Sequence, residues 1–168
     1  MRRVMIIGMS GAGKSTLCRT LGQQLGLPFY HLDSIYHTSG WVARPEDEVK
    51  ADFDAIAAQD AWVVDGNYRR LSESLRERAD GIVFLDFPRW YCMYQVIQRW
   101  AMHRTGLRKR VDLAEGFKDE FNFTFLKWVW NWRQQNRLRW LESLQPCMAK
   151  VRFFSNRSDV AAWRETLS

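Results

Sequence analysis

Short apolar runs recur along the chain and alternate with longer stretches of helical spacing. Most of these runs carry hydrophobic residues at consecutive positions rather than at every second position. We predict strands at residues 4–7, 29–32, 61–64, 81–86 and 151–154. Near-continuous apolar runs are typical of parallel strands that are covered on both faces. The pattern therefore predicts an α/β fold in three layers, with a five-stranded parallel sheet in the middle.

The stretches between these runs have the spacing of amphipathic helices. Leu17, Leu21 and Leu25 recur at four-residue intervals, which places them on one helix face. The helices are expected at residues 15–25, about 45–60, 71–78, 88–103, 121–144 and 158–167. Two segments interrupt the alternation. We therefore predict a single domain over residues 1–168, with a flap at about 34–60 and a basic, mobile lid at about 104–120.

The first strand leads into a glycine-rich loop that matches the phosphate-binding pattern Gly-x-x-x-x-Gly-Lys-Ser/Thr without a departure. Glycines let the backbone wrap a phosphate chain, and the following helix N-terminus adds partial positive charge. Lys14 is suited to the β- and γ-phosphates of ATP, and Ser15 to a Mg²⁺ ion. The expected nucleotide-binding residues are Gly8, Ser10, Gly11, Ala12, Gly13, Lys14, Ser15 and Thr16.

Two aspartates follow predicted strands at the sheet edge where open α/β folds bind ligands. Asp65 ends an apolar run and is assigned to the metal together with Ser15. Asp33 lies nineteen residues after Lys14. We assign it to orienting an acceptor hydroxyl or to taking its proton. The alternative for each is an aspartate that caps a turn, and Asp86 has the same ambiguity before a helix.

Basic residues are concentrated in the C-terminal part of the chain. The net charge is +6, and residues 101–168 carry thirteen of the 25 Lys and Arg against seven of the 19 Asp and Glu. Such a balance suits a polyanionic ligand, either nucleotide phosphates or a nucleic acid. Arg104 and Arg108 lie in the predicted lid and are expected to neutralise charge on a transferred phosphoryl group. The alternative is a solvated basic loop.

The helix predicted at 121–144 is unusually aromatic. Phe121, Phe125, Trp128 and Trp132 share one helical face, and we expect this stripe to face the core. Stacking on nucleic-acid bases is the alternative. Arg133 and Arg137, four residues apart on an adjoining face, are candidates for reaching the substrate's phosphates.

The remaining composition excludes several protein classes. No segment approaches the roughly 20 apolar residues of a membrane helix, and the N-terminal apolar run is too short for a signal peptide. We therefore expect a cytoplasmic protein that does not contact membranes. Cys18, Cys92 and Cys147 form no metal-ligand spacing with the three histidines. They are expected to be incidental thiols.

With these residues in hand, the chain resembles the P-loop kinases of the adenylate-kinase-like superfamily, and more closely the bacterial DNA topology modulation proteins. Five segments carry the resemblance: the phosphate loop, His31-Leu32-Asp33, residues 62–68, residues 84–89, and residues 125–130. It implies the three-layer P-loop NTPase fold with a substrate flap and an arginine-rich lid, and it implies that ATP and Mg²⁺ are bound.

The resemblance also implies roles for residues outside the loop. Arg99 is expected near the adenine, Arg104 in the lid, and Asn156 and Arg157 beside the base. Adenylate kinases read Asp-Gly-Phe-Pro-Arg where this chain has Asp-Gly-Asn-Tyr-Arg. That departure falls where the acceptor binds and argues against an AMP-like acceptor. The expected acceptor contacts are Asp33, Gly66, Asn67 and Arg69.

Two functions remain open on the sequence. The favoured one is an ATP-dependent kinase that transfers phosphate to an unidentified small molecule. The alternative is an ATP-binding regulatory protein that affects DNA topology through its basic C-terminal half. No helix-turn-helix, zinc-finger or basic-region pattern is visible, which favours the kinase.

Overall fold

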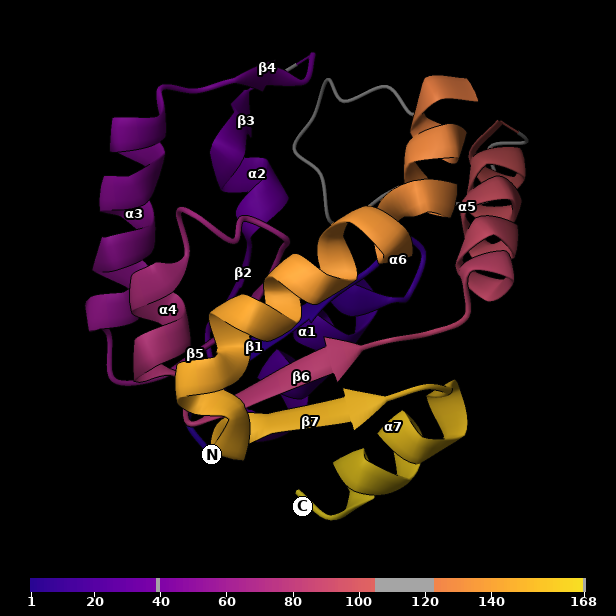
Figure 1. The fold of residues 1–168 in the computed structure, drawn as a ribbon. Helices are drawn as coiled ribbons and strands as arrows, with labels where there is room; N and C mark the ends of the chain where they lie inside the picture. The colour runs from indigo at the N-terminus through magenta and orange to yellow at the C-terminus, as the bar shows by residue number, and fades with distance from the viewer. Residues whose placement is uncertain (39, 105–122, 168) are drawn as a thin grey trace.

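A five-stranded parallel sheet forms the centre of the molecule (Figure 1). The computed structural model describes residues 1–38, 40–104 and 123–167. The strand order is β2-β5-β1-β6-β7, and every neighbouring pair runs parallel. The strands are β1 (Arg3–Gly8), β2 (Phe29–His31), β5 (Trp62–Asp65), β6 (Gly81–Leu85) and β7 (Val151–Phe154). Each of the five strands expected from the apolar runs is present, within about a residue of its expected ends.

β1 lies in the middle of the sheet, and both of its neighbours, β5 and β6, come later in the chain. Ile6 pairs with Asp65 of β5 on one side and with Val83 of β6 on the other. The side chains of Val4 to Ile7 are fully buried. This complete burial explains why the sequence there is apolar at every position.

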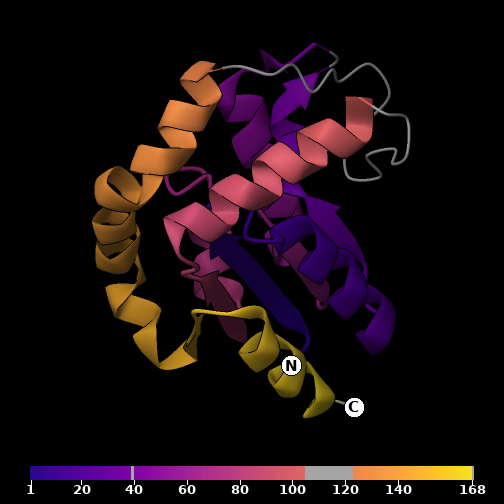
Figure 2. The ribbon, with the colours of Figure 1, turned by 90° about the vertical axis from the view of Figure 1, so that its right-hand side faces the viewer.

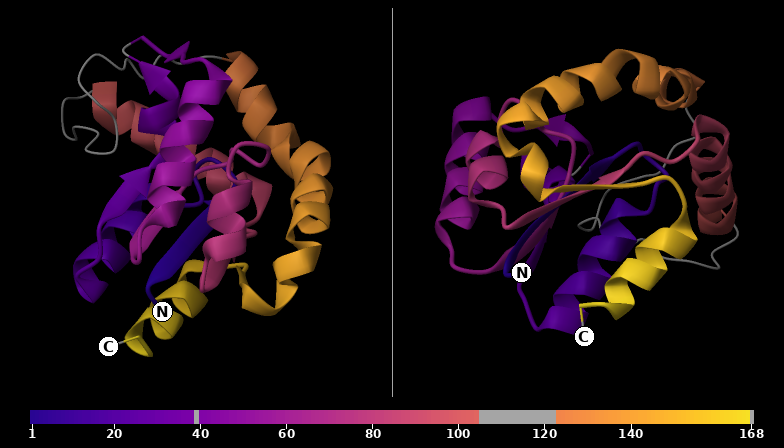
Figure 3. Two further views of the ribbon diagram at one scale, coloured as in Figure 1. Left: turned by 90° about the vertical axis from the view of Figure 1, so that its left-hand side faces the viewer. Right: turned by 60° about the horizontal axis from the view of Figure 1, so that its bottom comes forward.

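Helices cover both faces of the sheet, which confirms the expected three layers (Figure 3). α1 (Lys14–Leu25) and α7 (Arg157–Glu165) lie side by side on one face, where Gln24 and Arg164 are hydrogen-bonded. The other face is covered by α3 (Glu46–Ala58), α4 (Glu73–Arg78) and α6 (Phe123–Leu144). α5 (Arg89–Arg104) packs against α6 and crosses near the start of α1 (Figure 2). None of the helices in the described part of the chain combines the length and apolarity needed to cross a membrane.

The expected flap at 34–60 has more structure than the sequence suggested. Residues 32–36 form the short helix α2 (Leu32–Tyr36), so Leu32 opens a helix and does not end a strand. An antiparallel hairpin of β3 (His37–Thr38) and β4 (Val42–Ala43) follows, before α3. Arg44 secures this region, because its guanidinium donates to the Ile35 carbonyl and to Asp52 at 3.0 and 2.8 Å. The expected lid at 104–120 lies almost wholly outside the described residues.

The aromatic stripe of α6 is only partly core-facing. Trp132 is buried, but Trp128 is 40% exposed and stacks on Phe125 with ring centroids 5.8 Å apart. The buried positions of α6 are Val129, Trp132, Trp140 and Leu144. The face that packs on the sheet is therefore rotated away from Trp128, because Val129 takes the core position in that turn. Phe121 lies outside the described residues. A 3₁₀ segment, η1 (Gln145–Lys150), links α6 to β7.

One carboxylate fastens the start of β1 to the loop before β6. Asp80 Oδ2 accepts hydrogen bonds from the backbone N–H groups of Arg2 and Arg3 at 2.9 and 3.0 Å, and Oδ1 pairs with the Arg3 guanidinium at 2.8 Å. Partial burial acts to raise the pKa of Asp80, but these hydrogen bonds outweigh it and lower the pKa to about 2.

We therefore predict that Asp80→Asn destabilises the protein by about 1 kcal/mol at pH 7. An aspartate whose pKa is depressed in the folded state stabilises it above the unfolded pKa of about 3.9. That stabilisation is lost as the pH falls from about 4 towards 2. Urea unfolding at pH 7 and pH 3 measures the effect, and Asp60→Asn, at an exposed carboxylate, is the control. A difference between wild type and Asp80→Asn that is equally large at both pH values would contradict the assignment.

Candidate active site

The glycine-rich loop lies between the end of β1 and the start of α1. Gly13 has φ +89°, a left-handed conformation that favours glycine, and α1 begins at the next residue. Gly11 has φ +85°, and a Cβ there would collide with the backbone of Cys92 in α5. Gly8 is the last residue of β1, and Ser10, Gly11, Ala12 and Gly13 lie in the turn that follows it. The backbone thus curls into the nest that binds phosphate groups in proteins.

Lys14 turns its amine back over this loop. Nζ donates to the Met9 carbonyl at 3.3 Å. Burial lowers the pKa of Lys14, the carboxylates of Asp33 and Asp65 oppose that shift, and the positive charge of Arg99 adds to it. Arg99 of α5, expected near the adenine, therefore acts on the same region of space as Lys14. A covered amine inside a loop of backbone N–H groups fits an anionic phosphate chain.

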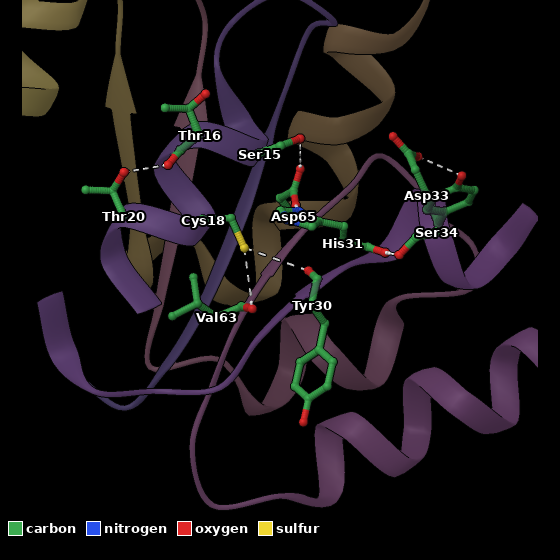
Figure 4. A network of polar contacts seen from close by, with 11 residues as sticks. Ser15, Thr16, Cys18, Thr20, Tyr30, His31, Asp33, Ser34, Val63 and Asp65 are labelled. Carbon is green, nitrogen blue, oxygen red and sulfur yellow. Dashed lines mark hydrogen bonds and ion pairs between the residues drawn. The ribbon is translucent and has the colours of Figure 1, made fainter. Parts of the chain in front are cut away.

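Asp65 and Ser15, the expected metal pair, lie together (Figure 4). The Ser15 hydroxyl donates to Asp65 Oδ2 at 3.0 Å, although the two residues are 50 positions apart. Asp65 is 2% exposed, and its Oδ1 contacts Nδ1 of His31. An oxygen pair of this kind beside a phosphate loop fits a Mg²⁺ ion. Thr16 is an exposed residue in the first turn of α1, and its carbonyl accepts a hydrogen bond from the Thr20 hydroxyl at 2.7 Å.

Asp33 lies in the first turn of α2. This helix follows the carboxyl end of β2, where His31 pairs with Asp65 of β5. Its Oδ1 accepts a hydrogen bond from the Tyr68 hydroxyl at 2.7 Å. Burial, followed by the charge of Asp33, raises the pKa of Tyr68, so the phenol stays protonated and donates. The Tyr68 ring also stacks on the Tyr36 ring of α2, with the ring centroids 4.6 Å apart. Tyr68 belongs to one of the segments that carry the family resemblance, but the sequence alone indicated no role for it in the site.

The residues expected to contact the acceptor, other than Asp33, make contacts with other parts of the protein. The Asn67 amide is bonded to the backbone of Gly8: Nδ2 donates to the Gly8 carbonyl at 2.7 Å and Oδ1 accepts from the Gly8 N–H at 3.3 Å. Asn67 thus shapes the base of the phosphate loop. Gly66 packs against Leu32 of α2. The Arg69 carbonyl accepts from the Arg76 guanidinium.

The remaining basic candidates lie farther along the chain. Arg133 and Arg137 both pair with Asp86 at the end of β6, with nitrogen–oxygen distances of 3.2 and 2.8 Å. Asn156 is the N-cap of α7, since its side chain accepts from the Asp159 N–H at 2.9 Å, and Arg157 begins that helix. The side chain of Arg104 and all of Arg108 lie outside the described residues.

Comparison with known proteins identifies the fold. No family model matches the chain. A 45-residue segment is 47% identical to the shikimate kinase of Rhodopseudomonas palustris (strain ATCC BAA-98 / CGA009) and covers 27% of this chain. The match spans only 22% of that relative's length.

Three solved structures cover most of both chains. A shikimate kinase from Acinetobacter baumannii in complex with shikimate has a TM-score of 0.63 at 15% identity, over 99% of this chain and 92% of that one. A shikimate kinase from Bacteroides thetaiotaomicron gives 0.53 at 16% identity, over 99% and 98%. A gluconokinase from Sinorhizobium meliloti 1021 gives 0.52 at 19% identity, over 92% and 82%. The chain therefore has the three-layer P-loop NTPase fold of these kinases, as the sequence predicted.

Proposed function

We propose that this protein transfers a phosphoryl group from ATP to a hydroxyl of a small molecule. The observation that carries the proposal is the setting of Lys14, whose amine lies within the glycine loop and within the electrostatic reach of both Asp33 and Asp65. Phosphoryl transfer needs this combination of a phosphate cradle, a metal carboxylate and a second carboxylate for the acceptor. The short match to a shikimate kinase and the fold shared with shikimate kinase and gluconokinase structures support it.

Each residue has a distinct task in this proposal. The loop N–H groups and Lys14 bind and orient the phosphates. Ser15 and Asp65 hold Mg²⁺, which neutralises phosphate charge when it is bound. Asp33 accepts the proton of the acceptor hydroxyl, and the Tyr68 hydroxyl fixes the orientation of its carboxylate. Arg99 adds positive charge beside Lys14, and the expected contributions of Arg104 and Arg108 remain predictions.

The position of Asp33 favours an alcohol as acceptor. The Asn67 amide is hydrogen-bonded to Gly8, so Asp33, Gly66 and Arg69 remain the candidates for acceptor contacts. Asn156 and Arg157 remain candidates for the nucleotide base.

DNA binding through the C-terminal half remains the alternative function from the sequence. It goes with the closer resemblance to the DNA topology modulation proteins. The pairing of Arg133 and Arg137 with Asp86 reduces the positive charge that α6 offers to such a ligand.

An acceptor panel tests the proposed function directly. We expect ATP consumption to rise above the acceptor-free rate with at least one small hydroxylated compound, in a panel that contains shikimate, gluconate, sugars and nucleoside monophosphates. Transfer is verified by isolating the phosphorylated acceptor. A salt-series DNA-binding assay run alongside distinguishes the alternative, because binding through phosphate contacts weakens steeply with salt. Slow ATP hydrolysis that no acceptor accelerates would contradict the kinase assignment.

Lys14→Ala is expected to abolish phosphoryl transfer and to leave the fold intact. Burial in the loop disfavours the charged form of the amine and lowers its pKa. We therefore expect that removing the amine does not destabilise the folded protein. Without it, the loop lacks the charge that orients the β- and γ-phosphates. Turnover and circular dichroism of the variant measure the two effects. Lys50→Ala removes an exposed lysine of α3 that pairs with Asp54 and serves as the control. Unchanged turnover in a folded Lys14→Ala protein would refute the role.

Asn substitutions at Asp33 and Asp65 are expected to fail differently. Asp33→Asn removes a proton acceptor, and transfer should fall by about 10²–10⁴-fold with the KM for ATP little changed. Asp65→Asn removes the charge beside Ser15, so the Mg²⁺ concentration needed for half-maximal rate should rise, and added Mg²⁺ should recover part of the rate. Kinetics across a Mg²⁺ titration separate the roles. An identical Mg²⁺ response of both variants would show that the division is wrong.

A further inference from the structure

Three side chains with metal-binding atoms meet beneath the phosphate loop. Cys18 comes from α1, His31 from the end of β2 and Asp65 from the end of β5 (Figure 4). One ligand atom of each, a thiol sulfur, an imidazole nitrogen and a carboxylate oxygen, lies within 4.8 Å of the other two. The residues are 13 and 34 positions apart. No sequence motif has that spacing, which is why the cysteines were expected to be incidental.

The cluster is enclosed by protein. Cys18 is fully buried, and the side chains of His31 and Asp65 are 14% and 3% exposed. The Cys18 thiol points towards β2 and β5, where its Sγ lies 3.8 Å from the Tyr30 carbonyl oxygen and 3.5 Å from the Val63 carbonyl oxygen. Burial and the charge of Asp65 raise the pKa of Cys18, so the metal-free site holds a neutral thiol. His31 Nδ1 and Asp65 Oδ1 are in direct contact.

We propose that Cys18, His31 and Asp65 form a three-ligand site for Zn²⁺. Tetrahedral zinc with bonds of about 2.0–2.3 Å places its protein ligand atoms about 3.4–3.6 Å from one another. The direct contact between His31 and Asp65 must therefore lengthen, and the sulfur must approach the other two ligand atoms by about 1.2 Å or less. Water takes the fourth position.

The charges of such a site balance inside the protein. Zinc binding releases the thiol proton of Cys18 to solvent, so that the thiolate and the Asp65 carboxylate together offset the two positive charges. His31 binds as the neutral imidazole. A neutral assembly avoids the cost of an uncompensated buried charge.

The ligand types of this site favour a different metal from the one at the proposed magnesium site. Sulfur and imidazole ligands favour zinc over Mg²⁺, which prefers oxygen alone. Asp65 belongs to both sites, with Oδ2 on the Ser15 side and Oδ1 on the His31 side. Zinc on Oδ1 therefore withdraws charge from the place where Mg²⁺ is needed, and it acts as an inhibitor of transfer. Only this inhibition rests on the proposed function; zinc binding itself does not.

Cobalt titration of the full chain, without ATP or acceptor, tests the site. Co²⁺ takes the same ligands as Zn²⁺, and a cobalt–thiolate bond adds a charge-transfer absorption in the near ultraviolet. We expect this band in the wild-type protein, at one Co²⁺ per chain, and its loss when Zn²⁺ is added. It should persist in Cys147→Ser, which alters a thiol outside the cluster, and be lost in Cys18→Ala. A wild-type protein without the band, or a folded Cys18→Ala protein that retains it, would overturn the proposal.

A histidine pair keeps the test decisive if Cys18→Ala fails to fold. His31→Gln removes the imidazole ligand and should weaken Co²⁺ and Zn²⁺ binding at least about tenfold. His37→Gln is the matched control, because His37 belongs to β3 and contacts the Asp33 carbonyl instead. Equal metal affinity in the two histidine variants would also overturn the site. Because no nucleotide is present, failure here would leave the kinase proposal intact.

Discussion

The contacts of the Asp65 carboxylate link the sheet to the phosphate loop. An ionised carboxylate is costly to bury unless its oxygens have partners. Asp65 meets this requirement through the Ser15 hydroxyl of α1 on one oxygen and the His31 ring of β2 on the other. The same two contacts hold the first turn of α1 at a fixed place relative to β2 and β5. The placement of the first turn of α1 beside the sheet depends on this one buried group.

A second constraint comes from Asn67, two residues farther along. Its amide bonds to both backbone groups of Gly8, where β1 gives way to the loop. A glycine loop is conformationally permissive, so its entry point needs an external anchor to be well defined. The segment from Asp65 to Tyr68 thus supplies the partner of Ser15, an anchor for the loop and the partner of Asp33 within four consecutive residues.

Continuous apolar runs and the glycine-rich sequence made the sheet and the turn between β1 and α1 predictable from sequence, because both patterns are local. The placement of Ser15 beside Asp65 also follows from the rule that parallel strands end at one edge. Asp33 in α2, its bond to Tyr68 and the meeting of Cys18 with His31 were not predictable in this way. Each depends on side chains brought together by strand order, and no spacing along the chain encodes that order.

The central position of β1 has a consequence for how the chain folds while it is being synthesised. Residues 3–8 leave the ribosome before their strand partners, which are residues 62–65 and 81–85. Until these partners emerge, the apolar residues Val4 to Ile7 remain without their neighbouring strands, and closing such long loops is slow.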